Sequence, residues 1–200
     1  MKKIVCLFFI TLFAGPLFAQ ESEGDQPEKT PMKPALLLID VQNQFMPMMA
    51  EKDVKEAPEY INWYMLLFRY YKLPVIRVYH SDPKWGPAPG SEGFAFDTVF
   101  KVEESDPIVI KTYGNSFTKT NLDSLLQAKG INTLFLCGLS ATGCVLATYI
   151  GASDHDYKVF MLKNALLSHD ADLTKAVQEF TSTISWDAIK LLLESTSEER

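Results

Sequence analysis

Residues 134–145 read Leu-Phe-Leu-Cys-Gly-Leu-Ser-Ala-Thr-Gly-Cys-Val, and this stretch decides the fold that the sequence predicts. It begins with a continuous apolar run, which is typical of a strand buried on both faces of a parallel sheet. The turn that follows places Cys144 at the start of the next predicted helix. A buried strand that leads directly into a helix indicates an α/β fold.

Working outward from this stretch, other segments alternate between the same strand character and a helical pattern. The predicted strands are residues 35–40, 75–80, 107–111, 131–137, 158–162 and 183–185, and the predicted helices are residues 54–72, 120–129, 143–154, 172–180 and 187–194. Thr120-x-x-Asp123 predicts a capping box on the second helix. Because crossovers between parallel strands are right-handed, the helices should cover both faces of one sheet. We therefore predict a three-layer α/β/α domain around a Rossmann-like, mostly parallel six-stranded sheet.

The N-terminal residues 1–19 have the layout of a secretory signal peptide, with Met-Lys-Lys before an apolar stretch that ends near Ala19. The alternative is a transmembrane anchor, but Gly15 and Pro16 interrupt a run that is short for a bilayer. We predict cleavage after Ala19. The protein is then expected to be exported, periplasmic or secreted, with no stable membrane anchor after cleavage.

The next segment, residues 20–33, is polar, charged and interrupted by proline, so we predict a disordered tether. Residues 34–200 are then expected to form one domain with a sizeable core. The chain has 47% hydrophobic and 22% charged residues and a formal net charge of -6 at pH 7. That charge argues against a phosphate-binding surface, so no nucleic-acid partner is expected.

The chain has three cysteines, and Cys6 should be removed with the signal peptide. Cys137 lies inside the apolar strand, where a free cysteine behaves as a small hydrophobic residue. A redox pair of Cys137 with Cys144 is the alternative, although the spacing is not Cys-x-x-Cys. We interpret Cys137 as a core residue.

Reactive side chains stand where the predicted strands end. Asp40, His80 and Lys111 each close a strand, and Cys144 follows the end of another. In parallel sheets, ligands bind beyond the carboxyl ends of the strands, so these groups should meet at one site. Taken singly each has an ordinary explanation, since such an Asp is often a turn residue, such a Lys a solvated strand end and such a Cys a core residue.

Together these groups could carry out covalent hydrolysis. A cysteine attacks as the thiolate, and its pKa falls at a helix N-terminus or near a cation, so we expect a lowered pKa for Cys144 beside Lys111. Asp40 could accept the thiol proton and return it to a leaving amine. The backbone amides from Leu139 to Cys144 are candidates for an oxyanion hole.

Three motifs carry a resemblance to a known family. They are Leu-Leu-Ile-Asp40-Val-Gln-Asn-Gln-Phe45, then Ile-Val-Ile-Lys111-Thr-Tyr-Gly-Asn-Ser-Phe117, then Leu-Cys-Gly-Leu139-Ser-Ala-Thr-Gly-Cys144-Val. In this order they resemble the isochorismatase-like cysteine hydrolases, which include nicotinamidases and N-carbamoylsarcosine amidase-like enzymes. The resemblance covers the chain from about Ala35 to the C-terminal helix.

The resemblance implies an Asp40-Lys111-Cys144 catalytic triad. In that family the thiol attacks an amide or carbamoyl carbon, ammonia or an amine leaves, and water then releases the acid. It also implies a cis peptide between Leu139 and Ser140, which would turn the Ser140 amide toward the oxyanion beside that of Cys144. No cofactor is implied, the partner is a small-molecule substrate, and dimers or larger assemblies are expected.

Some positions depart from family patterns. Zinc-dependent nicotinamidases of the family carry Asp-x-His with a further His, whereas this chain has His80-Ser-Asp82 and no second His nearby, so we expect no metal. True isochorismatases usually lack the thiol, so Cys144 favours amide chemistry over vinyl-ether cleavage. Asn164 stands where an Asp is common.

The predicted substrate pocket is an aromatic wall for a small planar or apolar molecule, although each residue could equally belong to the core. The predicted pocket residues are Phe45, His80, Trp85, Tyr113 and Phe117. The main hypothesis is an exported amidohydrolase with a thioester intermediate. An isochorismatase-type enzyme, a non-catalytic small-molecule-binding protein and a thiol oxidoreductase remain alternatives, and the sequence does not select one substrate.

Overall fold

The computed structural model describes residues 30–198. The predicted signal peptide, residues 1–19, lies outside the described residues, as does most of the predicted tether. The boundary predicted after residue 33 falls slightly inside the folded unit, because Asn132 donates to the Pro31 carbonyl at 2.8 Å and accepts from the Lys33 amide at 2.9 Å. Among residues 30–198, no helix is long and apolar enough to cross a membrane.

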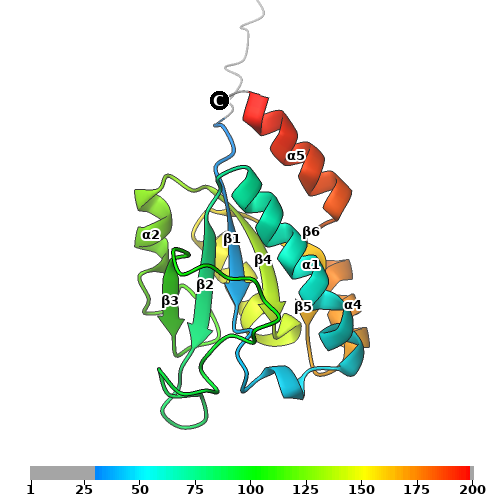
Figure 1. The fold of residues 1–200 in the computed structure, drawn as a ribbon. Helices are drawn as coiled ribbons and strands as arrows, with labels where there is room; N and C mark the ends of the chain where they lie inside the picture. The colour runs from blue at the N-terminus through cyan, green and yellow to red at the C-terminus, as the bar shows by residue number, and fades with distance from the viewer. Residues whose placement is uncertain (1–29, 199–200) are drawn as a thin grey trace, which may run out of the picture. The chain divides into compact units, whose positions relative to one another are not determined.

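One sheet of six strands organises the domain (Figure 1), and every pair of neighbouring strands is parallel. The spatial order is β3-β2-β1-β4-β5-β6. The strands are β1 (Pro34–Ile39), β2 (Val75–His80), β3 (Ile108–Lys111), β4 (Thr133–Leu139), β5 (Lys158–Leu167) and β6 (Thr183–Ile184). Every residue of β1, β2 and β4 is buried, as the apolar runs of β1 and β4 predict, and β2 also buries Arg77 and His80.

Within residues 30–198 four α-helices connect strands, a fifth follows the last strand, and two shorter helical turns lie near strand ends. The α-helices are α1 (Glu51–Tyr70), α2 (Leu122–Ala128), α3 (Leu146–Asp154), α4 (Ala171–Phe180) and α5 (Trp186–Glu198), and the turns are η1 (Met46–Met48) and η2 (Ala141–Val145). The predicted capping box of α2 does not form. Thr120 Oγ1 accepts from the Leu122 amide at 3.2 Å, whereas the Asp123 carboxylate accepts from the Tyr157 hydroxyl at 2.8 Å.

The helices lie on both faces of the sheet, which confirms the predicted three-layer α/β/α architecture. Figure 1 shows α1 in front of the central strands, and Tyr64 and Phe68 of this helix share one core with Ile189 of α5. A second core on the opposite face contains Leu122 of α2 and Val177 of α4. Alternating residues of the central strands enter the two cores, so the sheet is apolar on both sides.

Strand β5 is longer than the sequence predicts. The pairing of β4 with β5 shifts between Leu136 and Gly138, and β5 continues beyond this irregularity to Leu167. Asn164, in the irregular part, has φ 62. Asparagine tolerates this left-handed conformation better than most residues, so it can occupy the bend.

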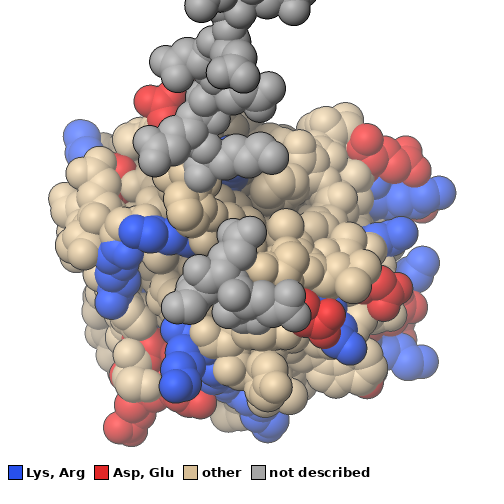
Figure 2. All heavy atoms as spheres, turned by 90° about the horizontal axis from the view of Figure 1, so that it is seen from above, with Lys and Arg blue, Asp and Glu red and all other residues tan. Residues whose placement is uncertain are grey.

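The charged side chains of the face at the amino ends of the strands are mixed in sign. Figure 2 shows this face, with Lys and Arg side chains interspersed with Asp and Glu around its edge. The candidate active site lies at the other end of the sheet, where the strands terminate.

Candidate active site

Three adjacent strands deliver three polar side chains to one edge of the sheet. His80 and Lys111 are register partners at the ends of β2 and β3. Asp40 directly follows β1, and its amide donates to the Val78 carbonyl of β2 at 2.9 Å. Its backbone turns out of the strand with φ 56, a left-handed conformation that Asp adopts more readily than most residues. The parallel arrangement therefore places the three side chains together.

Asp40 and Lys111 form a buried ion pair. Lys111 Nζ lies 2.7 Å from Asp40 Oδ2, and each residue is only 1% exposed. Lys111 Nζ also lies 3.3 Å from Nδ1 of His80, another buried side chain. A buried charge pair with one partner removed leaves an uncompensated charge, so the loss of either member destabilises the protein.

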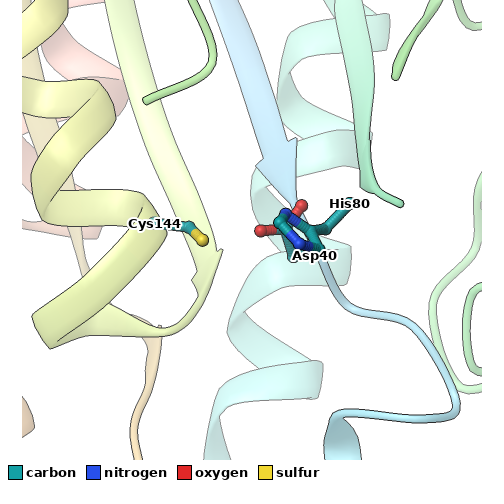
Figure 3. Close-up of side chains that lie close together, drawn as sticks. All are labelled: Asp40, His80 and Cys144. Carbon is teal, nitrogen blue, oxygen red and sulfur yellow. The ribbon is translucent and has the colours of Figure 1, made fainter. Parts of the chain in front are cut away.

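Cys144 approaches this group from the other side. It lies in η2, between the end of β4 and α3, and its sulfur, a ring nitrogen of His80 and a carboxylate oxygen of Asp40 all lie within 4.8 Å of one another. Figure 3 shows the thiol pointing toward Asp40 and His80. The structure thus brings together the three predicted triad residues from three separate segments.

The turn before Cys144 contains a cis peptide bond and two backbone hydrogen bonds to one carbonyl. The peptide bond between Leu139 and Ser140 is cis, at the position that the family resemblance implies. The amides of Gly143 and Val145 both donate to the Ser140 carbonyl, at 2.9 and 3.1 Å. The predicted oxyanion donors, the amides of Ser140 and Cys144, are not part of this pair of bonds.

The electrostatics of the thiol differ from the prediction. Burial, followed by the negative charge of Asp40, raises the pKa of Cys144 from 9.0 to about 11, and Lys111 only partly opposes this rise. The expected net lowering of the pKa is wrong because burial is the largest effect and, together with the charge of Asp40, outweighs the lowering by Lys111. Such a thiol stays protonated at neutral pH and needs a base to become a nucleophile.

Asp40 is suited to be that base. The pKa of its carboxyl is raised because burial outweighs the charge and the hydrogen bond of Lys111, which lower it. Its second oxygen, Oδ1, is buried and has no hydrogen-bond partner among the described residues. A carboxylate with one oxygen held by Lys111 and the other unpartnered can accept a proton from a thiol within 4.8 Å.

Gln42 is a supporting residue that the sequence analysis did not single out. Its side-chain amide donates to the carbonyls of His80 and Phe94, both at 3.1 Å, and its Oε1 accepts from the His80 amide at 2.7 Å. These bonds fasten the end of β2 to the segment after β1. In the sequence, Gln42 is only a single glutamine two residues after Asp40. Its burial could not be predicted because it depends on residues that are distant along the chain.

Three of the predicted pocket residues lie together. Phe45 contacts His80 and Trp85 edge to face, with centroid distances of 5.9 and 6.2 Å, and Trp85 stacks on His80 at 4.8 Å. Phe45 and His80 are buried, whereas Trp85 is 61% exposed. These three rings, here called the aromatic cluster, form one side of the site.

The other two predicted pocket residues lie elsewhere. Phe117 is a core residue, so its assignment to the pocket is wrong: its ring stacks on His155, which follows α3, at 4.6 Å. Tyr113 is 46% exposed, and its hydroxyl accepts from Lys119 Nζ at 3.1 Å. Both residues are close to Lys111 in sequence, but the chain after β3 turns toward α2 and carries Phe117 into the core.

Five hollows on the described surface have volumes of about 330 to 600 Å³, and none of these five is lined by Asp40, Lys111 or Cys144. The predicted pocket residues do not line these five hollows either. Cys144 is partly exposed, whereas Asp40, His80 and Lys111 are buried. Cys137 is fully buried in β4, as predicted, and burial raises the pKa of its thiol.

Asp40, His80 and Cys144 also offer three atoms that could hold a metal ion. Lys111 opposes this, because its ammonium lies 2.7 Å from Asp40 Oδ2 and 3.3 Å from His80 Nδ1. A cation bound to the other carboxylate oxygen and the other ring nitrogen would still lie close to this positive charge, which repels it. The donor set therefore does not fit a metal site while Lys111 is charged.

Comparison with known proteins identifies the family. The family model of the isochorismatase domain matches residues 34–187. The chain belongs to the isochorismatase family. This confirms the resemblance found in the three sequence motifs.

Individual isochorismatase relatives extend over different parts of the chain. The uncharacterized isochorismatase family protein YddQ of Bacillus subtilis (strain 168) is 30% identical over 139 residues, which cover 67% of this chain and 77% of that protein. The maleamate amidohydrolase of Pseudomonas putida is 27% identical over 78 residues, or 39% of this chain and 37% of that enzyme. The structure of N-carbamoylsarcosine amidase from Thermoplasma acidophilum matches with a TM-score of 0.67 and 27% identity, covering 77% of this chain and 95% of that one. The isochorismatase family thus includes amidohydrolases that act on C–N bonds.

Proposed function

We propose that this isochorismatase-family protein is a cysteine hydrolase that cleaves the C–N bond of a small amide or carbamoyl compound through a covalent thioester. The observation that carries the proposal is the meeting of a thiol, a carboxylate and an ammonium. The Cys144 sulfur lies within 4.8 Å of Asp40, and Asp40 is paired with Lys111 at 2.7 Å.

The first half of the reaction forms the acyl-enzyme. Asp40 takes the thiol proton as the sulfur of Cys144 attacks the carbonyl carbon, and a C–S bond forms. The carbonyl oxygen becomes an oxyanion, for which the amides of Ser140 and Cys144 are the proposed donors. Asp40 then gives its proton to the nitrogen, the C–N bond breaks, and ammonia or an amine leaves.

The second half releases the acid. Asp40, again a carboxylate, takes a proton from water as the water oxygen attacks the thioester carbon. The C–S bond then breaks, and the proton returns to the sulfur of Cys144. Lys111 remains paired with Asp40 throughout and keeps the carboxylate in reach of the thiol, so the same base serves both steps.

The raised pKa of Cys144 fits this sequence. A thiol with a pKa of about 11 is rarely ionised in the resting enzyme. Deprotonation by Asp40 is therefore coupled to attack, and the thiol is protected from unwanted oxidation between turnovers. The same raised pKa also favours the alternative, a non-catalytic protein that binds a small molecule, because a thiol without a functioning base would be inert.

One experiment separates these two functions. Purified protein is incubated with a panel of nicotinamide, carbamoylated amino acids and ureido compounds, and ammonia release is measured for wild type, Cys144→Ala and Cys137→Ala. We expect release that is lost in Cys144→Ala and retained in Cys137→Ala, with an acyl adduct on Cys144 visible by mass spectrometry. Equal release from wild type and Cys144→Ala would refute the thiol mechanism.

The apolar stretch before Ala19 supports a further proposal, that the enzyme works outside the cytoplasm. Edman sequencing or mass spectrometry of the mature N-terminus tests it. A secreted or periplasmic form that begins near Gln20 is expected, and an intact Met1 on protein recovered from the cytoplasm would contradict export. The proposed homo-oligomer is tested by light scattering on the same mature protein.

A further inference from the structure

We infer that His80 is a fourth functional residue of this site, and that its Nε2–H group binds an oxygen acceptor of the substrate beside the bond that is cleaved. The inference rests on the proposed function and narrows it. It selects amides that carry a second oxygen acceptor, a carbonyl or a carboxylate, a few bonds from the reacting carbon. His80 is thus a substrate-binding residue in addition to the triad.

Lys111 determines which nitrogen of His80 carries the proton. Its Nζ lies 3.3 Å from His80 Nδ1, and an ammonium can only donate hydrogen bonds. Nδ1 must therefore be the acceptor, which leaves the single proton of the neutral ring on Nε2. Burial and the positive charge of Lys111 both lower the pKa of His80, so the ring is neutral at neutral pH.

The Nε2–H group lacks an acceptor in the described part of the chain. His80 is 2% exposed, and its Nε2 is one of three buried side-chain atoms there with no hydrogen-bond partner. Buried donors are normally satisfied, because an unmade bond costs free energy. A bound molecule that offers an oxygen to Nε2 removes this cost, so the unpaired donor favours ligands of that kind.

The position of the ring is right for such a contact. A ring nitrogen of His80 lies within 4.8 Å of the Cys144 sulfur. Figure 3 shows the imidazole reaching from the end of β2 to lie beside Asp40, with the thiol facing both. A small substrate joined to the sulfur through its carbonyl carbon therefore extends over the imidazole.

The aromatic cluster defines how the acceptor reaches Nε2. Phe45 is buried and fixed against the edge of the His80 ring, whereas Trp85, stacked on that ring with an interplanar angle of 27°, is 61% exposed. Trp85 belongs to the loop after β2, and its carbonyl accepts from Gln44 Nε2 at 2.9 Å. Its indole is the part of the cover that a ligand can displace or slide beneath.

The protonation state of His80 can be tested without any substrate. Long-range nitrogen–proton NMR of the imidazoles in the wild-type protein distinguishes the two neutral tautomers and the imidazolium. We expect the Nε2–H tautomer for His80 at neutral pH, assigned by its loss in His80→Asn. A ring protonated on Nδ1, or doubly protonated, would overturn the inference, because Nδ1 would then not accept from Lys111.

Two variants distinguish the role of His80 Nδ1 from that of His80 Nε2. His80→Asn keeps an oxygen that can replace Nδ1 as acceptor for Lys111 but lacks the Nε2 donor, and His80→Gln places an amide donor near the Nε2 position. The substrates are butanamide, which has no second acceptor, and succinamide and succinamate, which have one. In wild type we expect a higher kcat/KM for the last two, by about tenfold for one hydrogen bond.

The expected pattern is a change in substrate preference and not a general loss. In His80→Asn the preference for succinamide over butanamide falls to near unity through KM, and His80→Gln restores part of it. His155→Asn is the control, because His155 stacks on Phe117 away from the site, and it should keep the wild-type preference. A preference unchanged in His80→Asn would refute substrate binding by Nε2.

Failure of the proposed function has a different signature. If wild type releases no ammonia from any amide, the comparison is made with alkylating agents on Cys144. Iodoacetamide offers a carbonyl acceptor and iodoethane does not. His80→Asn should slow alkylation by iodoacetamide more than by iodoethane, and equal effects on both reagents would refute the role of His80 whether or not the protein is an amidase.

Discussion

Replacing Asp40 by Asn tests the electrostatics of the site, because the reactivity of the Cys144 thiol should rise while the rate of hydrolysis should fall. The substitution removes the negative charge that, after burial, raises the pKa of Cys144, and it leaves the ammonium of Lys111 unpaired near the sulfur. The thiol should therefore ionise more readily and react faster with an alkylating agent. Hydrolysis should nevertheless be lost, because no group remains to carry the proton to the leaving amine.

The size of the effect follows from the geometry. Two unit charges 4.8 Å apart interact by about 3.5 kcal/mol at an effective dielectric constant of about 20, which corresponds to about 2.5 pH units. The pKa of Cys144 then falls from about 11 to roughly 8.5. At about pH 7.5 the thiolate fraction rises about 300-fold, and the lower nucleophilicity of the less basic thiolate reduces the gain in rate to about twentyfold.

The assay compares iodoacetamide labelling of Cys144, followed by peptide mass spectrometry, with ammonia release by the same samples. Asp53→Asn is the matched control: Asp53 is also buried, but it binds the Ser168 amide and the Thr174 hydroxyl, at 3.1 and 2.6 Å. The unpaired Lys111 costs about 3–5 kcal/mol of stability, so circular dichroism must show folded protein. Labelling that is unchanged or slower in folded Asp40→Asn would refute the proposed coupling of Asp40 to the thiol.

Three further predictions follow from the same contacts. Lys111→Met removes the charge that lowers the pKa of Asp40, so the pKa of Asp40 should rise and the acidic limb of the pH profile of kcat/KM should move to higher pH. Turnover at neutral pH should fall at least about a hundredfold. An unmoved acidic limb would contradict the role of Lys111. Gly138 has φ 108, and a Cβ at this position would overlap the Ile39 carbonyl. Gly138→Ala should therefore lower the free energy of unfolding, measured in urea, by more than about 3 kcal/mol. Gly114→Ala is the control, because its new Cβ would lie 3.6 Å from Ala147, and it should unfold like wild type. Dialysis against a chelator should leave kcat/KM within about twofold of the untreated value, because the Lys111 ammonium is bonded to two of the three candidate metal-binding residues. A loss of about tenfold that added zinc restores would show a metal site.

The sequence was sufficient to predict the sheet and the edge at which its reactive side chains gather. Continuous apolar runs such as residues 134–139 can only be buried on both faces, and the polar residue that ends each run must then lie at the carboxyl edge. This logic placed Asp40, His80 and Lys111 at one edge, with Cys144 one turn beyond the end of another strand, and the family resemblance implied which three of these groups form a triad. It did not find Gln42, because a buried glutamine has no periodic signal and its partners, His80 and Phe94, are far away along the chain.

Aromatic residues show where local reasoning fails. Phe45 and Phe117 stand at similar distances from strand ends in the sequence, yet Phe45 contacts His80 and Phe117 stacks on His155. The direction of the chain after each strand separates them, and that direction depends on packing against other elements. The predicted capping box failed for a related reason, because Tyr157 competes successfully for the Asp123 carboxylate.

By itself the sequence determined which residues are apolar, how they alternate and which reactive groups follow the strands, and these are properties of neighbours along the chain. The raised pKa of the Cys144 thiol, and the lack of a hydrogen-bond partner for His80 Nε2 among the described residues, come from the tertiary structure alone. Both properties depend on groups that the fold brings together from different strands. Burial and paired charges change the energy of an ionised group more than its sequence neighbours do.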